Sequence, residues 1–313
     1  MNLSLRWLLM LCLLATITTA TAQKTERFYT AAIADTARNY TLVIQPEKGR
    51  PAGMVLLFPG FGETPADVLK ETTFSMAATR AGYVVAIAVI DGNAGLYLTD
   101  AKQQRIAQLV QDLQKKYKLK DKKLAVGGFS MGGTTAVKFA EYSLATSAGP
   151  KVSALFAVDP LLDMERFERS VLKAVQRDQS PRAKQMLQYM QLLLQQDFGA
   201  TPVQNPEKFY TISPYAYSDT ANTAIKPLKQ LPVLLFSEPD AINQFNTNHR
   251  DLYDLNTADC MSMIADLQSM GNQQAQLVLT AGKGRRTDGT VNPHSWSILD
   301  VEQTIAWLKL HLK

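Results

Sequence analysis

The segment Leu124-Ala-Val-Gly-Gly-Phe-Ser-Met-Gly-Gly133 decides which fold the chain is expected to adopt. It begins as a short apolar run, turns through Gly128-Phe-Ser-Met-Gly132, and continues into a helix-like stretch at 134–144. A Gly-x-Ser-x-Gly pentapeptide between a strand and a helix is typical of a tight turn that exposes a nucleophilic serine. Such a turn needs small residues two positions before and after the serine, and Gly128 and Gly132 meet that need. The alternative is a glycine-rich turn whose serine is incidental, so the rest of the chain has to decide.

Apolar strand-like segments alternate with helix-like segments along most of the chain. This alternation predicts an α/β fold with a doubly wound, mostly parallel sheet. Two leading β-like segments, 24–32 and 39–45, predict an antiparallel edge. The further strands are predicted at 54–58, 83–90, 122–126, 152–158, 232–236 and 275–280, and the helices at 65–81, 100–117, 163–177, 181–197, 246–270 and 295–312.

Residues 161–228 interrupt the alternation. We expect them to form a helical cap or insert over the carboxyl ends of the strands. A helical pair docked on the outside of the sheet is the alternative. Because no linker-like stretch divides the rest, residues 23–313 are predicted to form a single domain.

The first 22 residues have the composition of a secretory signal peptide. Arg6 precedes an apolar core, and small residues end the segment at Ala20-Thr-Ala22. The apolar run is short of the roughly 20 residues that span a bilayer, which disfavours an uncleaved anchor. The protein is therefore expected to be exported, to a periplasmic or secreted location.

Composition limits the possible partners and cofactors. Removal of residues 1–22 takes away Arg6 and Cys12, so the formal net charge falls from +5 to +4 and Cys260 is the only cysteine left. One cysteine makes no internal disulfide, and a mild, dispersed positive charge does not indicate a nucleic-acid partner. No later segment predicts a membrane span. Scattered histidines and the lack of a Cys/His cluster predict no metal site, and no cofactor is expected.

A serine nucleophile needs a base, and the chain has three histidines. His249 lies among polar residues early in a predicted helix, and His311 is two residues from the end of the sequence. His294 lies in a loop between the last predicted strand and the last helix. Open α/β sheets place their sites in loops at the carboxyl ends of strands. Elimination therefore selects His294 as the base.

The acid that orients the base is expected after a strand between the serine and the histidine. Asp240 follows the 232–236 strand and is our first choice, because Pro239 fixes the turn. Glu238 in the same turn is the alternative acid, and Asp159, after the 152–158 strand, is a third possibility.

Backbone N–H groups are expected to stabilise the oxyanion of the transition state. The N–H of Met131, directly after the serine and at a helix N-terminus, is one expected donor. The second is expected in Pro59-Gly-Phe-Gly62, whose glycines allow close approach of the backbone to a ligand. Phe61 is the expected donor in that loop.

These motifs, in this order, resemble the α/β-hydrolase superfamily. The resemblance spans about residues 40–312 and is carried by Pro59–Gly62, Gly128–Gly132, Phe236–Asp240 and His294-Ser-Trp296. It is most like the secreted esterase-type hydrolases. By this resemblance Ser130 is the nucleophile, Asp240 the acid, His294 the base, and Phe61 and Met131 the oxyanion donors.

The expected activity is hydrolysis of a carboxylic ester through an acyl-enzyme. A peptidase or acyltransferase on the same scaffold, and a non-catalytic binding protein that retained the fold, are the alternatives. The expected substrate is a small-molecule or carbohydrate ester. Lys283, Arg285 and Arg286, which precede His294, suggest an anionic substrate group, although a solvated basic loop explains them as well.

Overall fold

A computed structural model describes residues 23–30, 35–96, 98–146, 149–177 and 181–313, so the expected signal peptide lies outside the described residues. Eight strands form one sheet in the order β1-β2-β4-β3-β5-β6-β7-β8. β1 and β2 pair antiparallel, as do β2 and β4, and the other neighbours pair parallel. This confirms the predicted doubly wound, mostly parallel sheet. The strands are β1 (Thr25–Phe28), β2 (Tyr40–Ile44), β3 (Gly53–Phe58), β4 (Tyr83–Val89), β5 (Leu124–Phe129), β6 (Val152–Val158), β7 (Val233–Ser237) and β8 (Ala275–Leu279).

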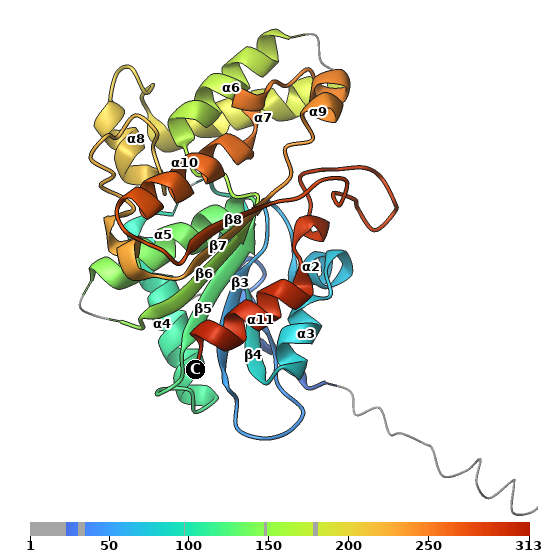
Figure 1. The fold of residues 1–313 in the computed structure, drawn as a ribbon, viewed down its shortest axis with the longest axis vertical. Helices are drawn as coiled ribbons and strands as arrows, with labels where there is room; N and C mark the ends of the chain where they lie inside the picture. Colours follow the sequence, from blue (N-terminus) through green and yellow to red (C-terminus); the bar gives the residue numbers. More distant parts are fainter. Residues whose placement is uncertain (1–22, 31–34, 97, 147–148, 178–180) are drawn as a thin grey trace, which may run out of the picture.

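Helices cover both faces of the sheet (Figure 1). Residues in β3, β4 and β5 are buried at every position, which explains why these strands are continuous apolar runs. One core lies between the sheet and α4 (Asp100–Lys116), α5 (Met131–Ala145) and α10 (Asn256–Ser269). The other lies against α2 (Pro65–Glu71), α3 (Phe74–Arg80) and α11 (Val301–His311).

Three of the predicted helices differ in the structure. The predicted helix at 295–312 is wrong at its start, because Leu299 is extended after a short 3-10 turn at 296–298 and α11 begins only at Val301. The other two are broken. The predicted helix at 65–81 is divided into α2 and α3 because Thr72 is extended, with φ −145°. The predicted helix at 246–270 is wrong at its start. Instead, α9 (Ala241–Asn248) ends where His249 takes a left-handed φ of 52°, and α10 begins only at Asn256. The intervening residues, which include the short 3-10 helix η3 (Leu252–Asp254), form a loop.

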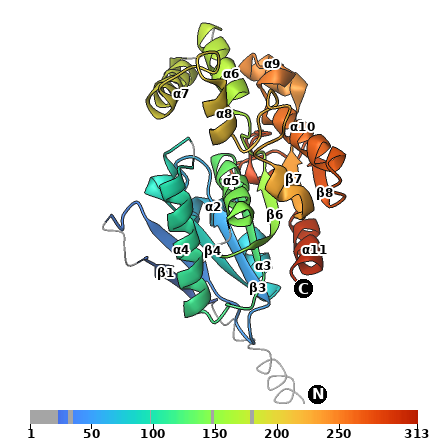
Figure 2. The same ribbon diagram turned by 90° about the vertical axis from the view of Figure 1, so that its left-hand side faces the viewer.

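Three helices lie beyond the carboxyl ends of the strands: α6 (Met164–Gln176), α7 (Pro181–Phe198) and α8 (Pro206–Ile212) (Figures 1 and 2). They share a third apolar core, in which Val171, Leu194 and Phe209 pack together with Met131 of the sheet domain. This core attaches the helices to the start of α5. Three further 3-10 helices complete the chain: η1 (Asp91–Asn93), η2 (Lys226–Gln230) and η4 (Trp296–Ile298).

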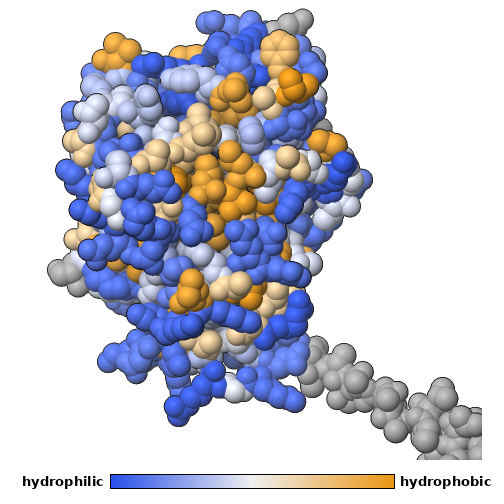
Figure 3. Space-filling view, in the orientation of Figure 1, coloured by the Kyte–Doolittle hydropathy of each residue, from blue (hydrophilic) through white to orange (hydrophobic). Residues whose placement is uncertain are grey.

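The outer strand β8 is at one edge of the sheet and is only partly covered. Figure 3 shows apolar side chains gathered near the middle of this face, over β8 and surrounded by polar residues. Leu279 at the end of β8 is 50% exposed. No helix in the described part of the chain is both long enough and apolar enough to cross a bilayer.

Glu141, on the α5 helix, allows a test of the packing behind the serine turn. It is buried beside Lys138, at 3.1 Å, and burial raises the pKa of its carboxyl to about 8. In the unfolded chain an ordinary glutamate loses its proton near pH 4.3. The contribution of Glu141 to the free energy of unfolding is therefore greatest below that pH and falls as the pH rises to about 8.

We expect Glu141→Gln to match the parent near pH 4.5 and to become more stable than the parent as the pH rises to 8.5. The advantage should reach roughly 1–3 kcal/mol, because the neutral amide removes the buried charge. Urea unfolding at both pH values measures it. An advantage that is the same at both pH values would contradict the assignment.

Candidate active site

Ser130 lies at the turn between β5 and α5 and has φ 52° and ψ −122°. A left-handed φ is strained for a residue with a side chain and persists only where the surroundings enforce it. The Ser130 N–H donates to Val158 O at 2.9 Å, and the Thr134 N–H donates to Ser130 O at 3.0 Å. Both the strand on one side and the helix on the other therefore hold the turn.

The two glycines of the pentapeptide are required by space rather than by φ. A Cβ on Gly128 would lie 2.4 Å from the backbone of Gly132. A Cβ on Gly132 would lie 2.0 Å from Phe58 O and 2.3 Å from Pro59 O. The start of α5 therefore touches the end of β3, and this contact brings Ser130 close to the loop that follows β3.

His294 contacts Ser130 on one side and Asp159 on the other. Its Nε2 lies 2.9 Å from Ser130 Oγ, and its Nδ1 lies 2.6 Å from Asp159 Oδ2. The three side chains come from the carboxyl ends of β5 and β6 and from the loop after β8. This is the nucleophile–base–acid geometry in which the acid orients the imidazole and the imidazole accepts the serine proton.

The structure corrects the choice of acid. His294 is paired with Asp159, the third possibility, and with neither Asp240 nor Glu238. Asp240 occupies the N-cap position of α9 with a left-handed φ of 31° and makes no capping hydrogen bond. Glu238 is buried and accepts hydrogen bonds from Thr280 Oγ1 (2.7 Å), Lys283 N (3.0 Å) and Gly284 N (2.9 Å). Its carboxylate therefore holds the loop that leads to His294 and is not hydrogen-bonded to the imidazole.

Asp159 is held in place by hydrogen bonds with β7 and with the start of α10. Its N–H donates to Phe236 O of β7 at 2.7 Å, and Ser237 Oγ donates to its Oδ1 at 2.6 Å. Asn256 Nδ2 donates to its backbone oxygen at 3.0 Å. The available sequence signal was an aspartate directly after a largely apolar strand and before Pro160.

The loop after β3 is organised by Glu63, a residue outside the predicted site. Glu63 Oε2 accepts from Gly60 N at 2.8 Å and from Trp296 Nε1 at 3.1 Å. Trp296 follows His294 by two residues, so one carboxylate ties the β3 loop to the histidine segment. A charge-assisted hydrogen bond of this kind is stronger than a neutral one.

The expected oxyanion donors, Phe61 and Met131, line the same pocket as Ser130 and His294. Among the described residues, neither backbone N–H has a hydrogen-bond acceptor. Two such N–H groups beside a serine hydroxyl are the arrangement that a developing oxyanion requires.

The basic residues before His294 point to partners within the protein. Lys283 Nζ lies 3.4 Å from Asp300, and Arg285 Nη1 donates to Gly289 O at 3.4 Å. Arg286 donates to His294 O at 3.3 Å. None of the three lines the pocket at Ser130, so the structure does not place them at a substrate.

The other two histidines do not line the pocket at Ser130. His249 ends α9 and its carbonyl accepts from Arg177 Nη1. His311 packs against Trp307, and burial lowers the pKa of its imidazole.

A pocket of about 260 Å³ opens from Ser130 toward α6 and α7. Most of its wall is apolar, but charged groups lie on the side of the loop between α9 and α10. Within the described residues, no three His, Cys, Asp or Glu side chains are grouped so as to hold a metal ion. The apolar wall includes Leu96, Leu161, Phe167, Val171, Met186 and Met190, and the polar wall includes Ser170, Glu238, Arg250, Asp254 and Asn256.

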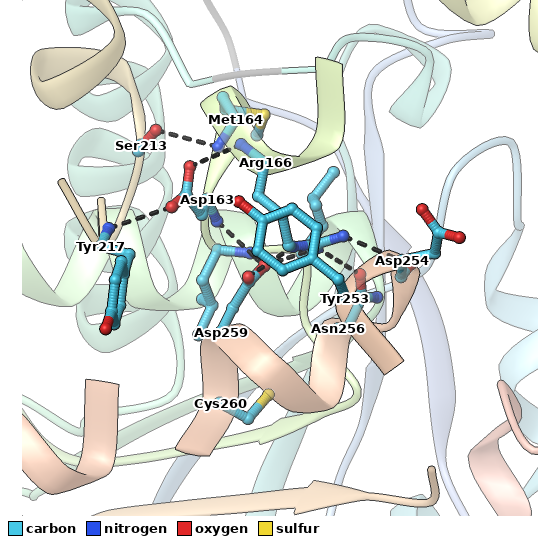
Figure 4. A network of polar contacts seen from close by, with 12 residues as sticks. Asp163, Met164, Arg166, Ser213, Tyr217, Tyr253, Asp254, Asn256, Asp259 and Cys260 are labelled. Carbon is cyan, nitrogen blue, oxygen red and sulfur yellow. Dashed lines mark hydrogen bonds and ion pairs between the residues drawn. The ribbon is translucent and has the colours of Figure 1, made fainter. Parts of the chain in front are cut away.

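A buried polar network joins α6 to the start of α10 beneath this pocket (Figure 4). The Arg166 guanidinium makes two hydrogen bonds to Asp259, at 2.5 and 2.6 Å, and a third to Asn256 Oδ1 at 3.0 Å. Asp163 caps α6 by accepting from Arg166 N and also accepts from Tyr217 N. Burial, and next the charge of Asp259, raise the pKa of Asp163.

With this geometry in view, comparisons with known proteins identify the fold. The sequence model of the family described as "Alpha/beta hydrolase of unknown function (DUF915)" matches residues 78–201, which include Ser130 and Asp159 but not His294. Comparison with curated protein sequences gives no match. The chain has the α/β-hydrolase fold, and the resemblance to that superfamily is confirmed.

Several solved structures are similar over nearly the whole chain. An esterase of Pyrococcus furiosus has a TM-score of 0.57 at 13% identity, with 93% of this chain and 92% of that chain covered. An S-formylglutathione hydrolase of Agrobacterium tumefaciens has a TM-score of 0.57 at 15% identity, with 94% and 99% covered. The carboxylesterase EstE1 from a metagenomic library has a TM-score of 0.58 at 14% identity, with 94% and 90% covered. At these identities the similarity concerns the fold.

The contact at Gly132 leads to a stability prediction. Gly132→Ala should lower the free energy of unfolding by about 3 kcal/mol, because its Cβ meets backbone oxygens that cannot move without displacing the end of β3. Gly60→Ala is the matched control, since the atoms nearest to its Cβ belong to the side chains of Phe129 (2.9 Å) and Glu63 (3.1 Å) rather than to the backbone. Urea unfolding of both variants should show the larger loss for Gly132→Ala, and equal losses would contradict the prediction.

Proposed function

We propose that the protein is a serine hydrolase that cleaves carboxylic esters through an acyl-enzyme. The observation that carries the proposal is the pair of hydrogen-bond distances at His294, 2.9 Å to Ser130 Oγ and 2.6 Å to Asp159 Oδ2. The fold, and its similarity to structures of an esterase, a carboxylesterase and an S-formylglutathione hydrolase, support the same reaction class.

In the first half-reaction, Ser130 Oγ attacks the ester carbonyl carbon while His294 Nε2 accepts the hydroxyl proton. The carbonyl oxygen becomes an oxyanion, which the N–H groups of Phe61 and Met131 stabilise. Asp159 stabilises the imidazolium through Nδ1–H. The carbon–oxygen bond to the alcohol then breaks, and the imidazolium gives its proton to the leaving oxygen.

In the second half-reaction, water replaces the alcohol. His294 accepts a proton from the water, whose oxygen attacks the carbonyl carbon of the acyl-Ser130 ester. The second oxyanion occupies the same site at Phe61 and Met131. The intermediate expels Ser130 Oγ, which regains its proton from His294, and the carboxylic acid is released.

Fluorophosphonate labelling tests the nucleophile and its base. The parent protein should be labelled at Ser130, because His294 makes this hydroxyl nucleophilic. Ser130→Ala and His294→Ala should each abolish labelling, measured by peptide mass spectrometry. Absence of labelling at Ser130 in the folded parent protein would contradict the proposal.

The identity of the acid gives a second test. Asp159→Asn should lower kcat on a 4-nitrophenyl ester by on the order of 10³–10⁴-fold, because the amide no longer stabilises the imidazolium. Asp240→Asn is the matched control and should change kcat less than about threefold. A loss confined to Asp240→Asn would return the role of acid to Asp240.

The export of the protein is also a proposal. Residues 1–22 support cleavage after Ala22, which leaves Gln23 as the first residue of the mature chain. Intact-mass measurement of protein recovered from the native host should give the chain that begins at Gln23. Recovery of chains that retain Met1 and residues 2–22 would reject cleavage.

A further inference from the structure

Arg250 is a cation on the wall of the pocket that contains Ser130 and His294. It lies directly after His249, where α9 ends, and its backbone N–H donates to Gln244 O at 3.2 Å. Among the described residues, its guanidinium has no hydrogen-bond acceptor and no ion-pair partner. Arg166 and Arg177, by contrast, are both paired with carboxylates.

The surroundings of Arg250 are those of a side chain in a cleft. Burial is the largest influence on its pKa and lowers it, yet the residue remains exposed to solvent. An arginine keeps its charge at neutral pH even with a lowered pKa. The guanidinium is therefore a partly desolvated positive charge that a molecule entering the pocket can reach.

The carboxylates around Arg250 are hydrogen-bonded to other groups, although Asp254 Oδ1 is buried and has no partner among the described residues. Asp254 Oδ2 accepts from Arg177 Nη1 at 2.7 Å and from Asp251 N at 3.1 Å. Asp159 is paired with His294 and Ser237. The charges of Asp254 and Asp159 act on Arg250 through space and raise its pKa, but neither is hydrogen-bonded to it.

A second unpaired donor, besides Arg250, lines the same pocket. Ser170 Oγ, on α6, is buried and has no hydrogen-bond partner among the described residues. Buried hydroxyls are almost always hydrogen-bonded, so an unpaired one facing a pocket indicates a missing partner. The pocket thus presents a guanidinium and a hydroxyl as donors within a largely apolar wall.

We propose that Arg250 binds a carboxylate group of the substrate. The preferred substrates are then esters that carry an apolar segment and, in addition to the ester group, one ionised carboxylate. The inference rests on the proposed ester hydrolysis at Ser130. Guanidinium and carboxylate match in a bidentate, charge-assisted geometry. A monoanion fits better than a doubly charged phosphate, because Glu238, Asp254 and Asp159 carry negative charge on the same wall.

The test compares charged and neutral esters of equal length. For the acyl side, the substrates are mono-4-nitrophenyl adipate and suberate, and their methyl-capped counterparts. For the alcohol side, they are 3-carboxyphenyl butyrate and 3-(methoxycarbonyl)phenyl butyrate, in which the ring carboxylate is methylated. The parent should show a higher kcat/KM for the carboxylate member on at least one side, and the two arms identify which side Arg250 contacts.

Arg250→Met should lower kcat/KM for that carboxylate substrate roughly 10- to 100-fold and leave the neutral counterpart within about twofold. Arg250→Lys should recover part of the loss, because lysine restores the charge but not the bidentate geometry. Arg285→Met is the matched control, since Arg285 does not line the pocket, and it should change neither substrate. Thermal unfolding of each variant reports whether the fold is retained.

The outcomes separate this inference from the proposed function. If neutral esters are cleaved and Arg250→Met leaves the carboxylate substrates of both arms unaffected, or lowers charged and neutral substrates alike, the inference is overturned and ester hydrolysis stands. If no ester is cleaved and Ser130 is not labelled, both fail. If Ser130 is labelled without ester turnover, labelling rates of a carboxylate-bearing and a neutral fluorophosphonate replace kcat/KM in the same comparison.

Discussion

The contact between the start of α5 and the end of β3 is the constraint on which the candidate site depends. With glycine at 132, the helix backbone approaches Phe58 O more closely than any side chain would allow. That approach accompanies the left-handed turn at Ser130 and brings the start of α5 against the end of β3 and the loop that follows it. This backbone contact therefore brings the nucleophile and the expected oxyanion donors, Phe61 and Met131, into one region.

The buried pair of Arg166 and Asp259 extends this order into the helices over the sheet. A buried pair is costly to desolvate and adds stability only where further hydrogen bonds satisfy it. Here Asp259 also accepts from Leu162 N and Asp163 N, and Arg166 reaches Asn256. Asn256 in turn donates to the backbone of Asp159. The pair thus links the wall of the pocket to the acid beside His294.

Ser130 and His294 were predictable because each was selected by a local requirement: small residues around a tight turn, and a histidine in a loop after a strand. The acid was not, because Asp159, Glu238 and Asp240 all follow strands and differ only in where their side chains point. The break at His249 escaped prediction for a related reason. The residues around His249 are all compatible with a helix, and none of them signals that His249 takes a left-handed conformation. Arg250 was therefore predicted to lie in a helix and not at the pocket.

Because the acid lies after β6, the residues at the end of β7 support the site instead of contacting the imidazole. Ser237 donates to Asp159, whereas Glu238 accepts two backbone N–H groups of the loop before His294. The imidazole is thus fixed directly through Asp159 and indirectly through the segment that carries it. Glu63 adds a third restraint, since it joins Trp296 to Gly60 in the β3 loop. A shift of the β3 loop would therefore move the expected oxyanion donor and the base together, which preserves their geometry relative to each other.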